Sequence, residues 1–206
     1  MTDDTQFKAW AKIPRLRRGC VITEKIDGTN AHILIRVLPA TEVVPPDPLI
    51  TAVVGQTLLY AGCRTRYITP EADNFGFAHW VRENAETLVK LGEGRHYGEW
   101  WGSGIQRTYG LNEKRFSLFN VSRAETYSPE DKLLLGAVGV GWVPVICDGD
   151  FTDGTVGAAL EDLRLNGSKA APGWMKPEGV VVFHKASGGL FKATLENDEA
   201  PKGAKS

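Results

Sequence analysis

The alternation of apolar and polar residues predicts strands over most of this chain. Residues 20–37 are predicted to form a hairpin that turns at Asp27 and Gly28, because an Asp-Gly pair favours a tight turn between strands. The proline-rich segment 38–49 is predicted to be a loop. Further strands are predicted at 52–60, 94–100, 116–121, 143–147, 179–184 and 190–195, with a turn at 187–189 between the last two.

Three segments predict helices. Apolar residues recur at helical spacing over 76–91, and Gly92 follows as a stop. Ser128 precedes a proline and two acids, which is typical of a helix start, and a third helix is predicted at 155–165, ending before Gly167. Strands outnumber helices and do not alternate regularly with them. The sequence therefore predicts an α+β fold with antiparallel sheets flanked by helices.

Length and composition are those of an ordinary globular protein. The 206 residues suit one main domain, which we expect at 20–196, with a basic lead-in at 1–19 and a tail at 197–206. No apolar run is long enough to span a bilayer, and the first residues lack a signal-peptide pattern, so the expected location is cytoplasmic. The three cysteines show neither zinc-ligand nor disulfide-framework spacing.

The net charge of −1 excludes a dedicated non-specific nucleic-acid binder, which is usually strongly basic. Any contact with nucleic acid therefore depends on a local patch. The best candidate is the N-terminal segment, where Trp10 lies among cations, although a solvated charged segment is an equal alternative. The cations of this segment are Lys8, Lys12, Arg15, Arg17 and Arg18.

The segment TEKIDGTN contains the first candidate for chemistry. Lys25 lies at the end of a predicted strand, two residues before the Asp-Gly turn. A lysine amine becomes a nucleophile when neighbouring cations or desolvation lower its pKa. This segment alone also fits a surface hairpin. Charged residues at or within other apolar strands are costly unless they are paired or face a site, and they recur along the whole chain.

These segments resemble, in order, the motifs of the covalent nucleotidyltransferases, which include RNA ligases, ATP-dependent DNA ligases and mRNA capping enzymes. The closest resemblance is to the RNA ligases that seal nicked or paired RNA ends. The resemblance covers residues 20–195 and implies a ligase-type adenylylation domain. The segments that carry it are EKIDGTN, GCRTR, YGEWWGSGIQRTYG, FSLFNV, PEGVVV and LFKATL.

The resemblance implies a role for seven residues. Lys25 is similar to the nucleophile that attacks the α-phosphate of ATP, and Glu24 to the residue whose backbone or side chain helps bind adenine. Arg64, or Arg66 as a weaker substitute, is similar to the arginine that contacts the nucleotide sugar or the acceptor phosphate. Phe119 resembles the aromatic ring that stacks on the purine. The remaining residues are Glu99 for ribose or a metal-bound water, Glu178 for the metal, and Lys192 for the α-phosphate.

The implied activity is ATP-dependent joining of RNA ends through lysyl-AMP, with Mg²⁺ or Mn²⁺ as cofactor and nucleic-acid ends as partners. A DNA nick ligase and a non-catalytic end-binding module are the alternatives. Each residue also has a structural alternative: an ion pair of Glu99 with Arg95 or Arg107, a core position for Phe119, or an edge-strand role for Lys192.

The sequence departs from the family pattern at three places. Lys192 stands alone where two lysines are usual, so one phosphate contact is missing or comes from Lys185. Cys63 precedes Arg64 where a serine is usual. No oligonucleotide-binding domain follows the last motif, and we expect weak acceptor binding or a protein partner that replaces it.

Overall fold

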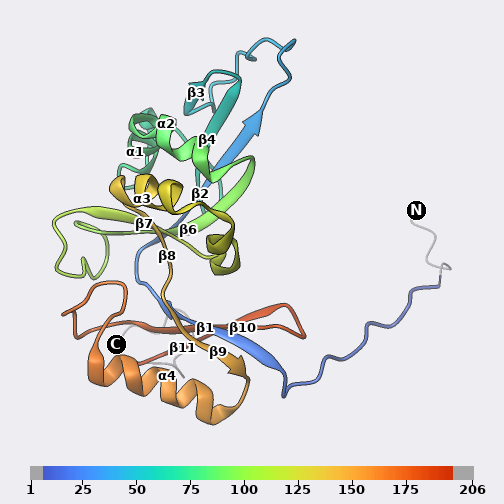
Figure 1. Cartoon of the computed structure of the whole chain (residues 1–206), viewed down its shortest axis with the longest axis vertical. Helices are drawn as coiled ribbons and strands as arrows, with labels where there is room; N and C mark the ends of the chain where they lie inside the picture. Colours follow the sequence, from blue (N-terminus) through green and yellow to red (C-terminus); the bar gives the residue numbers. More distant parts are fainter. Residues whose placement is uncertain (1–6, 197–206) are drawn as a thin grey trace.

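The computed structural model describes residues 7–196, which form two sheets, one above the other in Figure 1. The larger sheet has the strand order β3-β4-β2-β6-β7-β8, with β5 paired to β4. Its pairs are antiparallel except β7 with β8, which is parallel. Its strands are β2 (Thr29–Val37), β3 (Ala52–Val54), β4 (Thr57–Cys63), β5 (Tyr67–Ile68), β6 (Gly94–Gly102), β7 (Lys114–Leu118) and β8 (Val140–Trp142).

Helices cover only one face of the larger sheet (Figure 1). The side chains of β2 alternate, so that Ile33 and Ile35 join the core under these helices while Asn30 and His32 point to the opposite face. An aromatic cluster that includes Phe77 and Trp100 fills the same core. The helical elements are η1 (Pro70–Ala72), α1 (Phe77–Glu83), α2 (Ala85–Leu88), η2 (Val89–Leu91), η3 (Val121–Thr126) and α3 (Pro129–Ala137).

The smaller sheet has the order β11-β10-β1-β9, and its pairs are all antiparallel. The helix α4 (Asp153–Asn166) packs on one face, where Cys20 and Ile22 of β1 are buried. The alternate residues of β1, Val21, Thr23 and Lys25, face away from this helix. The strands are β1 (Gly19–Lys25), β9 (Val145–Asp150), β10 (Gly179–His184) and β11 (Gly189–Thr194).

The prediction of a hairpin at 20–37 is wrong. β1 and β2 do not pair: the first belongs to the smaller sheet and the second to the larger one, and Asp27-Gly28 carries the chain across. The backbone passes very close to β6 there, because a Cβ on Gly28 would lie 2.5 Å from the carbonyl oxygen of Trp100. The glycine therefore serves a close crossing, and not the tight turn that the dipeptide suggested.

Two other predictions need correction. The strand at 52–60 is two strands, β3 and β4, joined by a turn at Gly55, which has a positive φ of 57°. The helix at 76–91 is interrupted at Asn84, whose φ of −108° and ψ of 15° leave the helical region. Short-range periodicity did not reveal β5 and β8, which are only two and three residues long.

The α+β class with antiparallel sheets is confirmed. So are the strand at 179–184 and the helix cap at Ser128, whose side chain accepts a hydrogen bond from the Asp131 amide. The predicted helix at 155–165 begins earlier, capped by Thr152, and ends before Gly167 as expected. The tail at 197–206 lies outside the described residues. Within the described residues no helix is both long and apolar enough to cross a membrane.

The crossing at Gly28 gives a stability prediction. Replacing Gly28 with alanine forces a Cβ against the backbone of Trp100 and the Cβ of Trp101, so we expect a loss of about 1–3 kcal/mol in the free energy of unfolding. Gly157, inside α4 with nothing within 4 Å of an added Cβ, is the matched control. Gly157→Ala should stabilise the protein by about 0.5–1 kcal/mol, because alanine is the better helix former. Urea unfolding of both variants measures this, and equal stabilities would contradict the close crossing.

Candidate functional site

The helix-free faces of the two sheets border a common cleft of about 1380 Å³. The smaller sheet contributes Thr23, Lys25 and Val181, and the larger sheet contributes Asn30 and Glu99. Five of the seven site residues predicted from the sequence line this cleft. They are Glu24, Lys25, Arg64, Glu99 and Phe119. Glu178 and Lys192 lie outside the lining residues, and their positions are described below.

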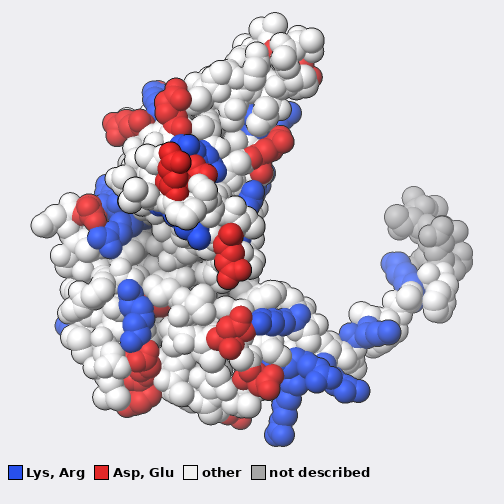
Figure 2. Space-filling view, in the orientation of Figure 1, with Lys and Arg blue, Asp and Glu red and all other residues white. Residues whose placement is uncertain are grey.

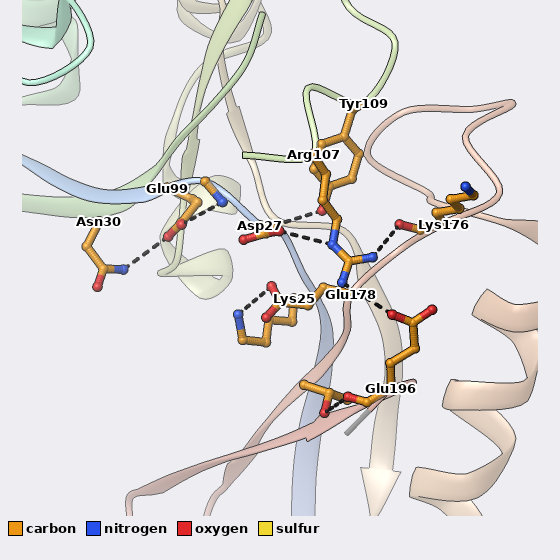
Figure 3. Close-up of polar contacts among 11 residues, drawn as sticks. Lys25, Asp27, Asn30, Glu99, Arg107, Tyr109, Lys176, Glu178 and Glu196 are labelled. Carbon is orange, nitrogen blue, oxygen red and sulfur yellow. Dashed lines mark hydrogen bonds and ion pairs between the residues drawn. The ribbon is translucent and has the colours of Figure 1, made fainter. Parts of the chain in front are cut away.

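Lys25 and Glu178 form an ion pair at the junction of the two sheets. Lys25 Nζ lies 2.5 Å from Glu178 Oε2, and their side chains are only 24% and 18% exposed. The register of the smaller sheet explains the contact, since Lys25 is opposite Gly179, the residue after Glu178. Figure 3 shows the two side chains meeting. The amine is therefore held within the cleft by an acid 153 residues away in the sequence.

Glu99 lies across the cleft on β6 and is buried. One carboxylate oxygen accepts a hydrogen bond from the backbone N–H of Gly28 at 3.1 Å, and the other from the Asn30 side chain at 3.0 Å (Figure 3). Burial raises the pKa of Glu99 to about 7, although the positive charge of Lys25 lowers it and the negative charge of Glu178 raises it further. The cleft thus places two carboxyl groups near one amine.

Glu24 points away from Lys25, as the alternation of β1 requires, and its carboxylate is buried. It accepts hydrogen bonds from the Ser168 hydroxyl at 2.6 Å and from the backbone N–H groups of Lys169 and Ala170 at 2.7 and 2.9 Å. Burial raises the pKa of Glu24 while these hydrogen bonds lower it. This carboxylate fixes the 168–170 loop, so a contact of Glu24 with adenine stays a prediction for its backbone.

Arg64 and Phe119 form part of the cleft wall opposite the smaller sheet. Arg64 is exposed and has neither a hydrogen-bond nor an ion-pair partner among residues 7–196, whereas Arg66 donates to the carbonyls of Tyr67 and Ala72. Phe119 follows β7, and its ring is 43% exposed. The alternative that Phe119 is a core residue is therefore wrong.

Lys192 is exposed on the edge strand β11. It is opposite Val181 on β10, which in turn is opposite Thr23 on β1, so Lys192 belongs to the cleft face two strands from the nucleophile strand. Lys185 also borders the cleft, but its amine forms an ion pair with Asp148 at 2.5 Å. The structure does not bring either lysine into contact with Lys25.

The sequence did not single out Arg107 and Tyr109, which fix the crossing between the sheets. Arg107 donates to the Asp27 carboxylate at 3.0 Å and to the carbonyl of Lys176 at 3.1 Å, and the Tyr109 hydroxyl accepts from the Asp27 amide at 2.7 Å (Figure 3). Both residues lie in loop 103–110, where Gln106, Thr108 and Tyr109 have positive φ values of 43°, 56° and 54°. Such backbone is strained for non-glycine residues, and strain of this kind clusters at functional sites.

The ion-pair alternatives for Glu99 are also wrong. Arg107 pairs with Asp27, and Arg95 contacts the ring nitrogen of His32 and the Tyr67 hydroxyl. A signal for Arg107 was present in the sequence, because its loop lies between two of the motifs, but only the folded chain shows which acid it meets. Among residues 7–196 no group of three or more acidic, histidine or cysteine side chains is arranged to bind a metal ion.

Known proteins support a specific relationship. The sequence model of the RNA ligase family matches residues 18–194. A mutant of the Naegleria gruberi RNA ligase with AMP and Mn resembles this fold with a TM-score of 0.53 at 20% identity, over 85% of this chain and 49% of that chain. A second mutant, with ATP and Mn, gives 0.50 at 20% identity over 86% and 50%. No curated protein sequence matches the chain significantly.

This chain spans about half the length of the structures that it matches, and at 20% identity their likeness shows the fold. The match to the family is broader, because it extends from the start of β1 to the end of β11. It thus includes every strand of both sheets and all seven residues named from the sequence. On this evidence the chain belongs to the RNA ligase family.

Proposed function

We propose that this chain is an ATP-dependent RNA ligase that carries AMP on Lys25. The observation that carries the proposal is the position of the Lys25 amine, in contact with Glu178 and at the mouth of a cleft large enough for a nucleotide. The family model supports RNA as the acceptor. The Naegleria gruberi structures with ATP or AMP and Mn support ATP and a divalent metal as cofactors.

The reaction has three steps. Lys25 Nζ forms a bond to the α-phosphorus of ATP, the bond from this phosphorus to the α–β bridging oxygen breaks, and pyrophosphate leaves. An oxygen of a 5′-phosphate end then displaces the lysine and takes the AMP. Finally a 3′-hydroxyl attacks that 5′-phosphate, which releases AMP and leaves a phosphodiester. Each step moves a phosphoryl centre between nucleophiles, so positioning and neutralisation of charge supply most of the catalysis.

Glu178 orients the amine for the first step. A protonated amine has no free lone pair, so Lys25 must lose a proton before it attacks. Glu178 Oε2, at 2.5 Å, accepts the hydrogen bond of that amine and fixes its direction. The hydrogen bonds of Arg107 and Tyr109 to Asp27 fix the backbone two residues further on. Together these contacts preorganise the nucleophile at the crossing between the sheets.

The residues present fit a divalent cation. Mg²⁺ and Mn²⁺ prefer oxygen ligands, and Mg²⁺ is usually bound by one or two carboxylates, water and the phosphates of its substrate. Glu99 and Glu178, on opposite sides of Lys25, are the residues that would bind it. When bound, the metal supplies positive charge that offsets the negative charge of the triphosphate.

The other assignments follow the wall of the cleft. The half-exposed ring of Phe119 is available to stack on adenine, because a flat aromatic ring gains contact with a base without requiring its sequence. Arg64 is available for the sugar or the acceptor phosphate, and Lys192 for the α-phosphate once the two sheets close on ATP. The cytoplasmic location and a protein partner in place of a C-terminal domain stay predictions.

Two alternatives remain distinct from this proposal. A DNA nick ligase uses the same first step, and matched nicked RNA and nicked DNA substrates separate the two acceptors directly. A non-catalytic end-binding module has no need of a preorganised amine, so the close pair of Lys25 and Glu178 argues against it.

The first prediction concerns the covalent intermediate. Incubation with α-labelled ATP and Mg²⁺ or Mn²⁺ should leave label on the denatured protein, because a phosphoramidate survives denaturation. Pyrophosphate should release the label, and Lys25→Ala should abolish it. Lys132→Ala, which removes an exposed lysine of α3, should label normally. Absence of label on the unmodified chain with ATP, GTP and NAD alike would sink the enzymatic proposal.

The second prediction separates chemistry from stability at Glu178. Glu178→Gln keeps the shape of the side chain but removes its charge, so the rate of label incorporation should fall by about 100-fold or more. The melting temperature should change by only a few degrees, because the pair is partly exposed. A severe drop in melting temperature, with activity that recovers at low temperature, would instead make Glu178 a structural residue.

The third prediction concerns the cost of burying Glu99. A carboxyl whose pKa in the folded state is about 7, against an ordinary 4.5, contributes stability below pH 4.5 that is lost as the pH rises through 7. Glu99→Gln removes this loss and can keep both hydrogen bonds if Asn30 turns its amide. We therefore expect the variant to be more stable than the unmodified chain by up to about 3 kcal/mol at pH 8.5, and by little at pH 4.5. Equal pH profiles in denaturant unfolding would show that the carboxylate is not destabilised by burial.

A further inference from the structure

Residues 7–18 form an arm that leaves the body of the protein before β1 begins (Figure 1). It contains no helix or strand, and each of its residues is exposed. Four large apolar side chains recur every third residue along it and are 93%, 90%, 87% and 68% exposed, in chain order. They are Phe7, Trp10, Ile13 and Leu16. So much apolar surface without a partner marks an interaction site.

The base of the arm is attached to the smaller sheet. The buried ring of His184 donates from Nε2 to the carbonyl of Leu16 at 2.7 Å, and the amide of Phe151 donates to the carbonyl of Arg18 at 2.8 Å. The ring of His184 packs edge-on against Phe151. These contacts fix where the arm leaves the body, at the end of β1 opposite Lys25.

The charge of the arm is opposite to that of the body. The arm contains five of the 24 basic side chains of the chain and none of its 25 acidic ones, so the remainder carries a net negative charge. Figure 2 shows basic side chains along the arm and at its base. None of the five forms an ion pair with any residue of the described range 7–196. Five unpaired cations with interleaved aromatic rings suit a polyanion whose bases can stack.

We propose that the arm binds the RNA strand that carries the acceptor end, which rests on the proposed ligase function. Lys8, Lys12 and Arg15 contact phosphates, and Trp10 stacks on a base. Seven residues of β1 separate the base of the arm from Lys25, or about 20 Å at the rise of an extended strand. An ATP molecule at Lys25 is too small to reach the arm, whereas a polynucleotide spans this distance. The arm therefore acts in the steps that use RNA and not in self-adenylylation.

The test compares two variants with the same change in charge. The arm variant carries Lys8→Gln, Lys12→Gln and Arg15→Gln. The control variant carries Lys90→Gln, Lys132→Gln and Arg164→Gln, three exposed positions on η2, α3 and α4. Measurements are label incorporation from α-labelled ATP, KM for a nicked RNA, and binding of a fluorescent RNA by anisotropy at several salt concentrations.

We expect the arm variant to incorporate label normally, while its KM for nicked RNA rises about tenfold and the slope of log K against log salt falls by about 2, since each phosphate contact to a single strand contributes about 0.7. The control variant should match the unmodified chain in all three measurements. Trp10→Ala should also raise the KM for RNA, and Trp10→Phe should restore most of the loss because stacking needs only a ring.

Distinct results would overturn the proposal. Normal RNA binding and KM in the arm variant would show that the arm has no role with RNA, and an equal loss in the control variant would reduce the effect to overall charge. A change in oligomeric state in Trp10→Ala by light scattering, with RNA binding unchanged, would make the arm a protein-docking segment. Failure of the unmodified chain to incorporate label would instead defeat the ligase function, and the anisotropy measurement would still decide RNA binding by the arm.

Discussion

The ion pair between Lys25 and Glu178 depends on a single geometric constraint, the point where the chain leaves one sheet and enters the other. Lys25 is the last residue of β1, and the backbone then crosses against β6 at Gly28 with no room for a side chain. The antiparallel register with β10 brings Glu178 to the same point. If β1 and β2 formed a hairpin, the amine would lie on one sheet and not between two. The cleft, the acids and the nucleophile therefore all depend on this crossing.

Much of the local chemistry around the crossing is unfavourable for stability. Glu99 is a buried carboxyl whose pKa rises to about 7, and the loop that contains Arg107 and Tyr109 has three non-glycine residues at positive φ. Both features cost free energy, and both act on the same short stretch, since Glu99 accepts from the Gly28 amide while Arg107 and Tyr109 contact Asp27. The packed core beneath the helices offsets that cost. This distribution is expected where a nucleophile must be held in one orientation.

The protein divides its electrostatic work between the cleft and the arm. The cleft combines acids with exposed cations such as Arg64, which suits a small, highly charged ligand and a cation. The arm is purely basic, and its exposed aromatic and aliphatic side chains suit an extended polymer. Because β1 connects the two directly, a strand bound along the arm would be aligned with the strand that presents Lys25. A chain of nearly zero net charge can in this way serve a polyanionic substrate.

The sequence by itself determined the α+β class, the bounds of β10, the cap of α3 and the end of α4, because these follow from alternation and capping between near neighbours. The order of its motifs also indicated the family, with Lys25 and Glu178 named before any geometry. Only the tertiary structure decided that β1 and β2 part into different sheets, that the Glu24 carboxylate faces away from the nucleophile, and that Arg107 meets Asp27. These outcomes depend on pairings between residues 80 or more apart and on the space left by Trp100, and neither is encoded in local periodicity.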